Sequence, residues 1–323
     1  MMPSDTALRV VLAQPRGFCA GVDRAIDIVE LALARYGAPV YVRHEIVHNH
    51  HVVERLRGLG AVFVKEVTEV PYGAVTIFSA HGVSQRVEGM ARLRALDVID
   101  ATCPLVHRVH QEGRRYAEAG FDVILIGHQG HAEIEGTKGQ IPGTVHVIAQ
   151  PCEVADLVVA DAEKVAYVTQ TTLSPFDTRD VIAALRARFP RIKGPDTRDI
   201  CYATHNRQQA LLALVPEVDL VLVVGARNSS NTARLREIGE RAGLPTYLVG
   251  HADELDPAWF DGIARVALTA GASAPESLVQ GVLARLSTLR TLQIEIQDGK
   301  QEHVRFRLPA RLSDVSEAHL VKV

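Results

Sequence analysis

The sequence "LRVVLAQPRGFCAGVDRAIDIVE" (8–30) passes from an apolar run, through a cysteine between two glycines, into a helix-forming segment. The run 8–14 is rich in valine and leucine without polar alternation, which is typical of a strand buried in a parallel sheet. From residue 21 to 36 the apolar residues recur at helical spacing. Cys19 therefore lies in the turn between a buried strand and a helix.

The same pattern repeats along the chain. Ten further short apolar runs predict strands at 39–44, 61–64, 75–81, 97–102, 122–128, 145–148, 165–171, 219–225, 245–250 and 265–271. Helical patterns lie between many of them, which indicates an α/β protein. The spacing is too irregular for one eight-stranded barrel, so we expect several small open sheets.

The end of the chain has a different pattern. The segment "TLQIEIQDGKQEHVRFRLP" (291–309) alternates apolar and polar residues around "DGKQ", which predicts a C-terminal antiparallel β-hairpin. We expect three small, mainly parallel α/β domains around a central site, followed by this hairpin and a tail. The predicted boundaries are 8–103, 104–197, 198–290 and 291–323.

Composition excludes several classes of protein. A net charge of −3 argues against nucleic acid or an anionic membrane as the main partner. No apolar run reaches the roughly 18 residues that a membrane span needs, and the N-terminus lacks the pattern of a secretory signal. We therefore expect a cytoplasmic protein. In that reducing compartment, four dispersed cysteines indicate metal binding, catalysis or burial rather than a disulfide framework.

Three of the cysteines occupy comparable places. Cys19, Cys103 and Cys201 each lie in a short turn context, 84 and 98 residues apart, whereas Cys152 precedes a predicted surface helix. A single cysteine is most often a small buried hydrophobic residue, but three at such places suggest a shared centre. Three thiolates can hold zinc with one open position, or three corners of a [4Fe–4S] cluster. Spacing alone does not choose between them.

Other polar residues also follow predicted strands. The stretch "GHQGHAEIEGTKGQ" (127–140) is either a glycine-rich surface loop or a site in which a histidine and a carboxylate handle protons. "NSSN" (228–231) is either a plain helix cap or a phosphate site at a helix N-terminus. Neither a phosphate-binding P-loop nor a dinucleotide fingerprint is present in the sequence.

Nine ordered motifs together resemble one family. They are "PRGFCAGVDRAI", "HEIVHN", "FSAHGVS", "DATCPLV", "GHQGHAEIEGT", "QTTLS", "ICYATHNRQ", "NSSN" and "AGASAPE". Over about residues 8–288 the chain resembles the 4-hydroxy-3-methylbut-2-enyl diphosphate reductases (the IspH/LytB family). This resemblance implies an oxidoreductase of the last step of the methylerythritol phosphate route to isoprenoids, which forms isopentenyl and dimethylallyl diphosphates.

The resemblance also implies roles for particular residues. Cys19, Cys103 and Cys201 would hold a [4Fe–4S] cluster with an open fourth iron. Glu133 would be the proton source, with Thr171 and His131 assisting. The residues expected to bind substrate are His48, His81, His131, Thr171, Thr172, Ser229, Ser230, Asn231 and Ser273. The family also implies an electron donor such as flavodoxin or ferredoxin.

Two other functions use the same residues. A zinc-dependent hydrolase would use the three cysteines as ligands and Glu133 as a base. A non-catalytic redox sensor would use an iron–sulfur cluster as a switch, although we find no segment typical of a DNA-binding or partner-binding module.

Overall fold

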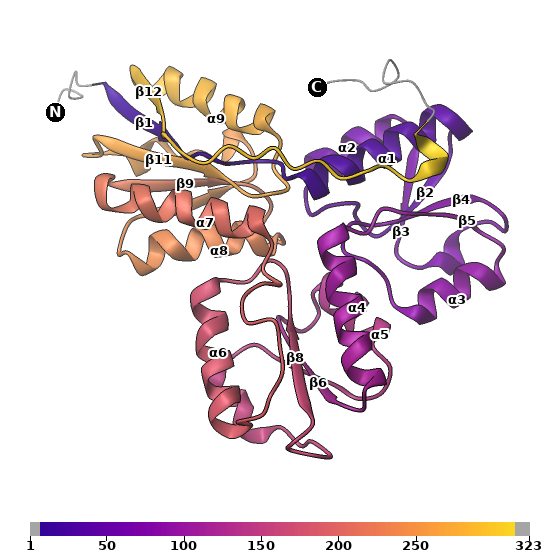
Figure 1. The fold of residues 1–323 in the computed structure, drawn as a ribbon. Coiled ribbons are helices and arrows are strands. Elements are labelled where there is room, and N and C mark those ends of the chain that lie inside the picture. The colour runs from indigo at the N-terminus through magenta and orange to yellow at the C-terminus, as the bar shows by residue number, and fades with distance from the viewer. Residues whose placement is uncertain (1–6, 314–323) are drawn as a thin grey trace.

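The structure is a computed structural model that describes residues 7–313. Figure 1 shows three lobes, each built on its own parallel sheet. All eleven predicted strands are present, and a twelfth follows them. The several small parallel sheets expected from the sequence are confirmed.

The first sheet has the strand order β3-β2-β4-β5. Its strands are β2 (Val40–Arg43), β3 (Ala61–Val64), β4 (Val75–Phe78) and β5 (Asp97–Asp100). Helices α1 (Ala20–Tyr36) and α2 (His50–Gly58) pack on one face, and α3 (Gln85–Leu93) packs on the other.

The second sheet has the strand order β7-β6-β8. It consists of β6 (Asp122–Ile126), β7 (Val145–Ile148) and β8 (Val165–Thr169). Helix α6 (Pro175–Arg188) covers one face, while α4 (Pro104–Glu118) and α5 (Ala132–Gln140) cover the other. The stretch 127–140 is therefore mostly a helix rather than a surface loop.

The third sheet has the order β10-β9-β11-β1-β12. Its strands are β1 (Leu8–Leu12), β9 (Leu220–Val224), β10 (Thr246–Val249), β11 (Arg265–Ala270) and β12 (Leu292–Ile296). Helix α9 (Glu276–Leu289) covers one face, and α7 (Tyr202–Leu214) and α8 (Ser230–Arg241) cover the other. The structure thus differs from the predicted boundaries, because β1 pairs within the third sheet and the chain then crosses to the first.

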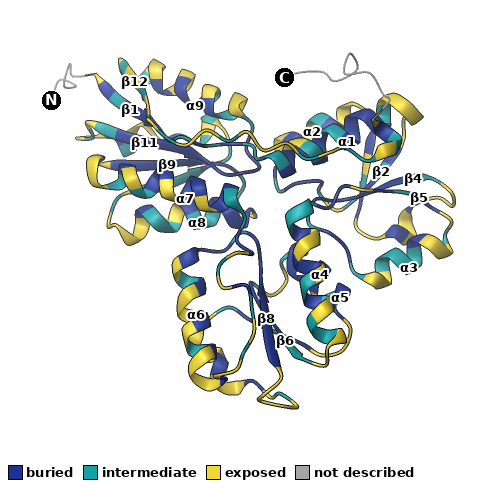
Figure 2. Ribbon diagram, in the orientation of Figure 1, coloured by how far each residue is buried: buried dark blue, intermediate teal, exposed yellow. Residues whose placement is uncertain are grey.

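Coverage on both faces explains the apolar strands. Strand β9, in the interior of the third sheet, is buried at every position. Strand β8 is also buried at every position, although it lies at an edge of the second sheet. In Figure 2 these strands are dark blue, whereas the outer faces of the helices are yellow. Because no strand in the middle of such a sheet has a face toward water, continuous Val, Leu and Ile runs are favoured there.

The predicted C-terminal hairpin is wrong for the described residues. β12 pairs in parallel with β1, and residues 297–309 form neither helix nor strand. This C-terminal segment (297–312) crosses from the third lobe to the first, where Leu308 and Leu312 pack against the core beside α1. Gly299 allows this segment to pass close to the backbone of Gln14, because a Cβ at position 299 would lie only 2.2 Å from the Gln14 carbonyl oxygen. The rest of the predicted tail, 314–323, lies outside the described residues.

Alternation of apolar and polar residues fits any strand with one covered face, and it does not specify the partner strand. Here the partner strand is β1, and β12 forms the edge of the third sheet. The residues after β12 are stabilised by contacts with other parts of the chain instead of by a returning strand.

Candidate active site and cofactor centre

The three cysteines begin three helices. Cys19, Cys103 and Cys201 are the N-cap residues of α1, α4 and α7, and all three line one cavity between the lobes. Gly21 lies among them: a Cβ at this position would be 2.8 Å from the Cys103 sulfur and 3.8 Å from the Cys19 sulfur. The cavity therefore gathers three thiols and three helix N-termini, whose dipoles favour negative charge.

The pKa values of all three thiols are raised. Burial raises the pKa of Cys103 to about 12, and the neighbouring Cys19 adds to the rise. Burial likewise raises the pKa of Cys201 to about 11. Burial also raises the pKa of Cys19, although the Arg207 guanidinium opposes it. The thiols are therefore protonated at neutral pH until a metal displaces the protons.

Glu133 lies in the first turn of α5 and is only 3% exposed. Its carboxylate accepts two hydrogen bonds from Thr171, at the end of β8: one from the backbone N–H at 2.7 Å and one from the hydroxyl at 3.0 Å. Burial raises the pKa of Glu133 to about 7, while the Thr171 hydrogen bonds oppose the rise. A carboxyl group with this pKa exchanges protons readily at neutral pH.

Three histidines line the same cavity as Glu133. The ring centroids of His48 and His81 are 4.1 Å apart, and His131 lies 5.3 Å from His48 and 5.9 Å from His81. Burial, followed by the neighbouring His48, lowers the pKa of His131 to about 4 and that of His81 well below its usual value. Both rings are therefore neutral at pH 7.

The histidine nitrogens also have defined partners. Nδ1 of His131 accepts a hydrogen bond from the Glu133 backbone N–H at 3.2 Å, so in the neutral ring Nε2 carries the proton. Nδ1 of His48 lies 3.2 Å from a Glu45 carboxylate oxygen. Nε2 of His48 is buried and has no hydrogen-bond partner among the described residues. Because buried polar nitrogens are almost always bonded, this atom indicates a ligand position.

A helix N-terminus supplies further polar groups. Ser229 is the N-cap of α8, and the next residue, Ser230, donates a 3.4 Å hydrogen bond to the Thr172 carbonyl. Oδ1 of Asn231 accepts a hydrogen bond from the Ala272 backbone N–H at 2.9 Å. This end of the cavity therefore combines hydroxyl groups, an amide and the N-terminus of a twelve-residue helix.

Ser273 joins this group from the loop between β11 and α9. Its hydroxyl donates a 2.9 Å hydrogen bond to the His48 carbonyl and lies 3.5 Å from the Ser229 hydroxyl. It thereby connects the third lobe with the first lobe at the histidine cluster.

The structure brings every residue predicted for the site to this one cavity. Its lining includes Cys19, His48, His81, Cys103, His131, Glu133, Thr171, Thr172, Cys201, Ser229, Ser230, Asn231 and Ser273. Cys152, which was given no role, is exposed in the second lobe.

Other lining residues were not predicted. The Thr204 hydroxyl lies 3.0 Å from the Cys201 sulfur, and its backbone N–H donates to that sulfur at 3.2 Å. Tyr202 lines the cavity beside it, and Phe306 reaches it from the C-terminal segment. Thr204 and Tyr202 belong to the motif "ICYATHNRQ", which could have indicated them, whereas Phe306 lies outside every motif.

Within residues 7–313, no group of three or more His, Cys, Asp or Glu side chains is arranged to hold a single metal ion. No helix in this part of the chain is long and apolar enough to cross a membrane.

The fold and the cavity define a class of α/β protein in which three parallel sheets share one thiol-containing site. Residues 10–287 match the family described as "LytB protein", and the chain belongs to this family. It is 60% identical over 306 residues to the 4-hydroxy-3-methylbut-2-enyl diphosphate reductase of Burkholderia pseudomallei, covering 95% of this chain and 98% of that one. It is 58% identical to the reductase of the same name from Zymomonas mobilis, covering 94% and 90% of the two chains.

Two solved structures are similar. The E-1-hydroxy-2-methyl-but-2-enyl-4-diphosphate reductase of Plasmodium falciparum superposes with a TM-score of 0.89 at 36% identity, covering 95% of this chain and 97% of that one. A second structure is described as (E)-4-hydroxy-3-methyl-but-2-enyl diphosphate reductase, the terminal enzyme of the non-mevalonate pathway. It has a TM-score of 0.62 at 34% identity and covers 87% of this chain and 99% of that one.

Proposed function

We propose that this protein reduces (E)-4-hydroxy-3-methylbut-2-enyl diphosphate to isopentenyl diphosphate and dimethylallyl diphosphate. In this reaction the substrate takes up two electrons and two protons, its allylic C–O bond breaks, and the oxygen leaves as water. The observation that carries the proposal is the convergence of three thiols and the Glu133–Thr171 pair on one cavity. The names of the similar proteins support the choice of substrate.

The residues present fit a [4Fe–4S] cluster. Cys19, Cys103 and Cys201 would each bind one iron and leave the fourth without a cysteine ligand. Gly21 supports this assignment, because any side chain there would collide with the thiols that must surround the cluster. When bound, the cluster would supply electrons and a Lewis-acidic iron for the substrate hydroxyl.

Glu133 would deliver a proton to the leaving oxygen. Its raised pKa leaves a substantial fraction of the carboxyl protonated at pH 7, so it can donate without leaving its buried position. The Thr171 hydroxyl holds the carboxyl group in place and is itself within reach of the cavity. Nε2–H of His131 would donate to the substrate and orient it.

The diphosphate would bind at the opposite end of the cavity. His48 and His81, the hydroxyl groups of Ser229, Ser230 and Ser273, the amide of Asn231 and the adjacent Thr172 would surround it. Hydroxyl, amide and imidazole donors together with a helix N-terminus suit a small anion in the absence of a P-loop.

The electrons must come from outside the chain. We propose a small redox protein such as a flavodoxin or ferredoxin as the donor, and a cytoplasmic location, where the cysteines stay reduced.

The test is anaerobic purification followed by iron analysis and turnover with a chemical reductant. We expect about four irons per chain and conversion of the allylic diphosphate into the two products. A colourless protein with one tightly bound zinc would favour the hydrolase instead. A protein with a bound cluster and no turnover would favour the redox sensor.

A further inference from the structure

Arg207, on α7, is the largest fully buried side chain in the described part of the chain and is only 1% exposed. A buried guanidinium is costly unless its charge and its N–H groups are all paired. Its partners therefore indicate why the cationic side chain is placed there.

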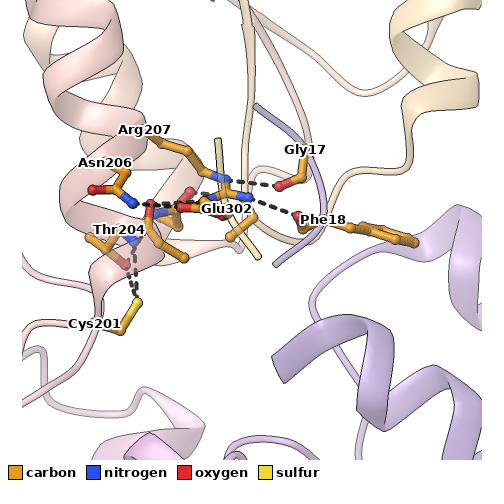
Figure 3. Close-up of polar contacts among 10 residues, drawn as sticks. Gly17, Phe18, Cys201, Thr204, Asn206, Arg207 and Glu302 are labelled. Carbon is orange, nitrogen blue, oxygen red and sulfur yellow. Dashed lines mark hydrogen bonds and ion pairs between the residues drawn. The ribbon is translucent and has the colours of Figure 1, made fainter. Parts of the chain in front are cut away.

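Two of these partners belong to the turn that carries Cys19. Nε of Arg207 donates to the Gly17 carbonyl at 2.8 Å, and Nη2 donates to the Phe18 carbonyl at 2.8 Å. In Figure 3 the guanidinium points from α7 toward this turn. Two parallel hydrogen bonds from one planar group fix both the distance and the orientation of the residues just before Cys19.

A third partner lies beside Cys201. Nη1 donates to the Ala203 carbonyl at 3.0 Å, in the first turn of α7. The Arg207 side chain therefore bonds to the backbone next to Cys19 and to the backbone next to Cys201. These two proposed cluster ligands lie 182 residues apart in the sequence (201 minus 19).

The counter-charge comes from the C-terminal segment. Nη1 of Arg207 lies 3.2 Å from a Glu302 carboxylate oxygen, and the Asn206 side-chain amide donates to the same carboxylate at 2.8 Å. Glu302 retains a side-chain exposure of only 14%. Figure 3 shows it between Asn206 and the Arg207 guanidinium.

The position of the charge also matters for the metal site. The Arg207 guanidinium bonds to the backbone immediately before Cys19 and to the backbone two residues after Cys201, so its positive charge lies near both proposed ligands. Glu302 offsets part of this charge because it carries the opposite one.

We propose that Arg207 is a positioning residue for the cluster: it fixes the Cys19 turn against the start of α7, and with Glu302 it sets the electrostatic potential at the metal site. The inference rests on the proposed function for the presence of a cluster. It assigns a role to a residue outside the predicted site and to the C-terminal segment.

The test compares four variants of the full-length protein. Arg207→Lys keeps the charge but lacks the planar group whose two separate nitrogens bond the Gly17 and Phe18 carbonyls. Arg207→Gln removes the charge, and Glu302→Gln removes only the counter-charge. Arg9→Lys is the matched control, because Arg9 pairs with Glu295 between β1 and β12 at 2.6 Å, outside the cavity lining. The readouts are iron content after anaerobic reconstitution, the reduction midpoint potential of the bound cluster, and amide hydrogen exchange of residues 17–22 in the metal-free protein.

We expect Arg207→Lys to accelerate exchange across 17–22 and to lower iron content while leaving the potential close to that of the parent. Arg207→Gln should move the potential to a more negative value, and Glu302→Gln should move it to a more positive value with exchange unchanged. Opposite shifts distinguish an electrostatic role from general loosening, and Arg9→Lys should match the parent in every readout.

Normal exchange and iron content in Arg207→Lys, or potentials that shift in the same direction in Arg207→Gln and Glu302→Gln, would overturn the inference. If the parent protein binds no iron, the proposed function fails instead. The hydrogen-exchange comparison still decides whether Arg207 holds the Cys19 turn. Should Arg207→Gln not fold, Arg207→Lys and Glu302→Gln carry the test.

Discussion

The two ends of the cavity differ in how their side chains exchange protons when a ligand binds. At the thiol end, Cys19, Cys103 and Cys201 cap α1, α4 and α7 and carry protons that a metal must displace. At the other end, burial lowers the pKa values of His81 and His131 and keeps both rings neutral, and we expect a bound anion to raise these pKa values again. Loading a cluster should then release protons and binding a diphosphate should take them up, so we expect the two events to respond to pH with opposite signs.

The largest expected effect is at the thiol end. We expect Cys103→Ser to lose iron and to reduce turnover to background, roughly 10³-fold or more, because one corner of the cluster loses its ligand. Cys152→Ser is the matched control, since Cys152 is exposed and remote. Iron analysis and the anaerobic assay measure both, and full activity in Cys103→Ser would remove this residue from the ligand set.

A comparison of two glutamates on α5 tests whether Glu133 is the proton donor. Glu133 is 3% exposed and bonded to Thr171, whereas Glu135, two residues later on α5, is exposed. We expect Glu133→Gln to lower kcat by about 10²–10⁴-fold with unchanged iron content, and Glu135→Gln to have little effect. Equal losses in both variants would indicate damage to α5 rather than loss of a proton donor.

The pKa of Glu133 gives the same prediction a pH dependence. Because this pKa is raised to about 7, the protonated donor is lost as the pH rises above 7, and kcat should then fall about tenfold per unit. A kcat that stays constant from pH 6 to 9 would show that Glu133 does not deliver the limiting proton.

A smaller effect is expected at the diphosphate end. The Ser230 hydroxyl makes only a 3.4 Å bond to the Thr172 carbonyl, so it is available to a ligand. Ser230→Ala should raise KM roughly tenfold, which corresponds to about 1.5 kcal/mol for a hydrogen bond to a charged group. Ser287→Ala, on the exposed side of α9, is the control. An unchanged KM in Ser230→Ala would place the diphosphate elsewhere.

The sequence predicts some helices and misses others for a physical reason. Helices such as α1 and α8 show an apolar stripe, and the sequence predicts both. Helix α7 instead buries the polar residues Thr204, Asn206, Arg207 and Gln208, so no amphipathic pattern marks it. Helix α5 similarly buries Glu133, Thr137 and Gln140 and contains two glycines. The helices hardest to recognise are those that bury several polar side chains.

Contacts between residues that lie far apart in the sequence are the second feature that the sequence does not predict. The strand patterns predict β1 and β12, but nothing local indicates that they pair with each other, with Leu8 opposite Leu292. The Arg207–Glu302 pair spans 95 residues and involves a segment that the sequence assigned to a hairpin. Strand ends, by contrast, meet at predictable edges of parallel sheets, and this rule placed the predicted residues near one centre.

The smallest effect tests the proton balance directly. Nε2 of His48 is buried and has no hydrogen-bond partner in the described part of the chain, so this nitrogen is available to a bound anion. We expect the anion to raise the pKa values of His131 and His81, which burial lowers. The affinity for inorganic diphosphate should therefore weaken as the pH rises from 6 to 9.

Calorimetry at pH 7 in two buffers of different ionisation enthalpy measures the number of protons taken up. We expect the protein to take up protons in addition to any that diphosphate takes up, with a total of less than about one proton per bound diphosphate. We expect this number to be smaller in His81→Asn. His251→Gln, whose side chain is 57% exposed, is the control and should match the parent. Net proton release, or the same uptake in His81→Asn as in the parent, would contradict the opposite pH responses of the two ends, because the histidines would then not be the groups that gain protons.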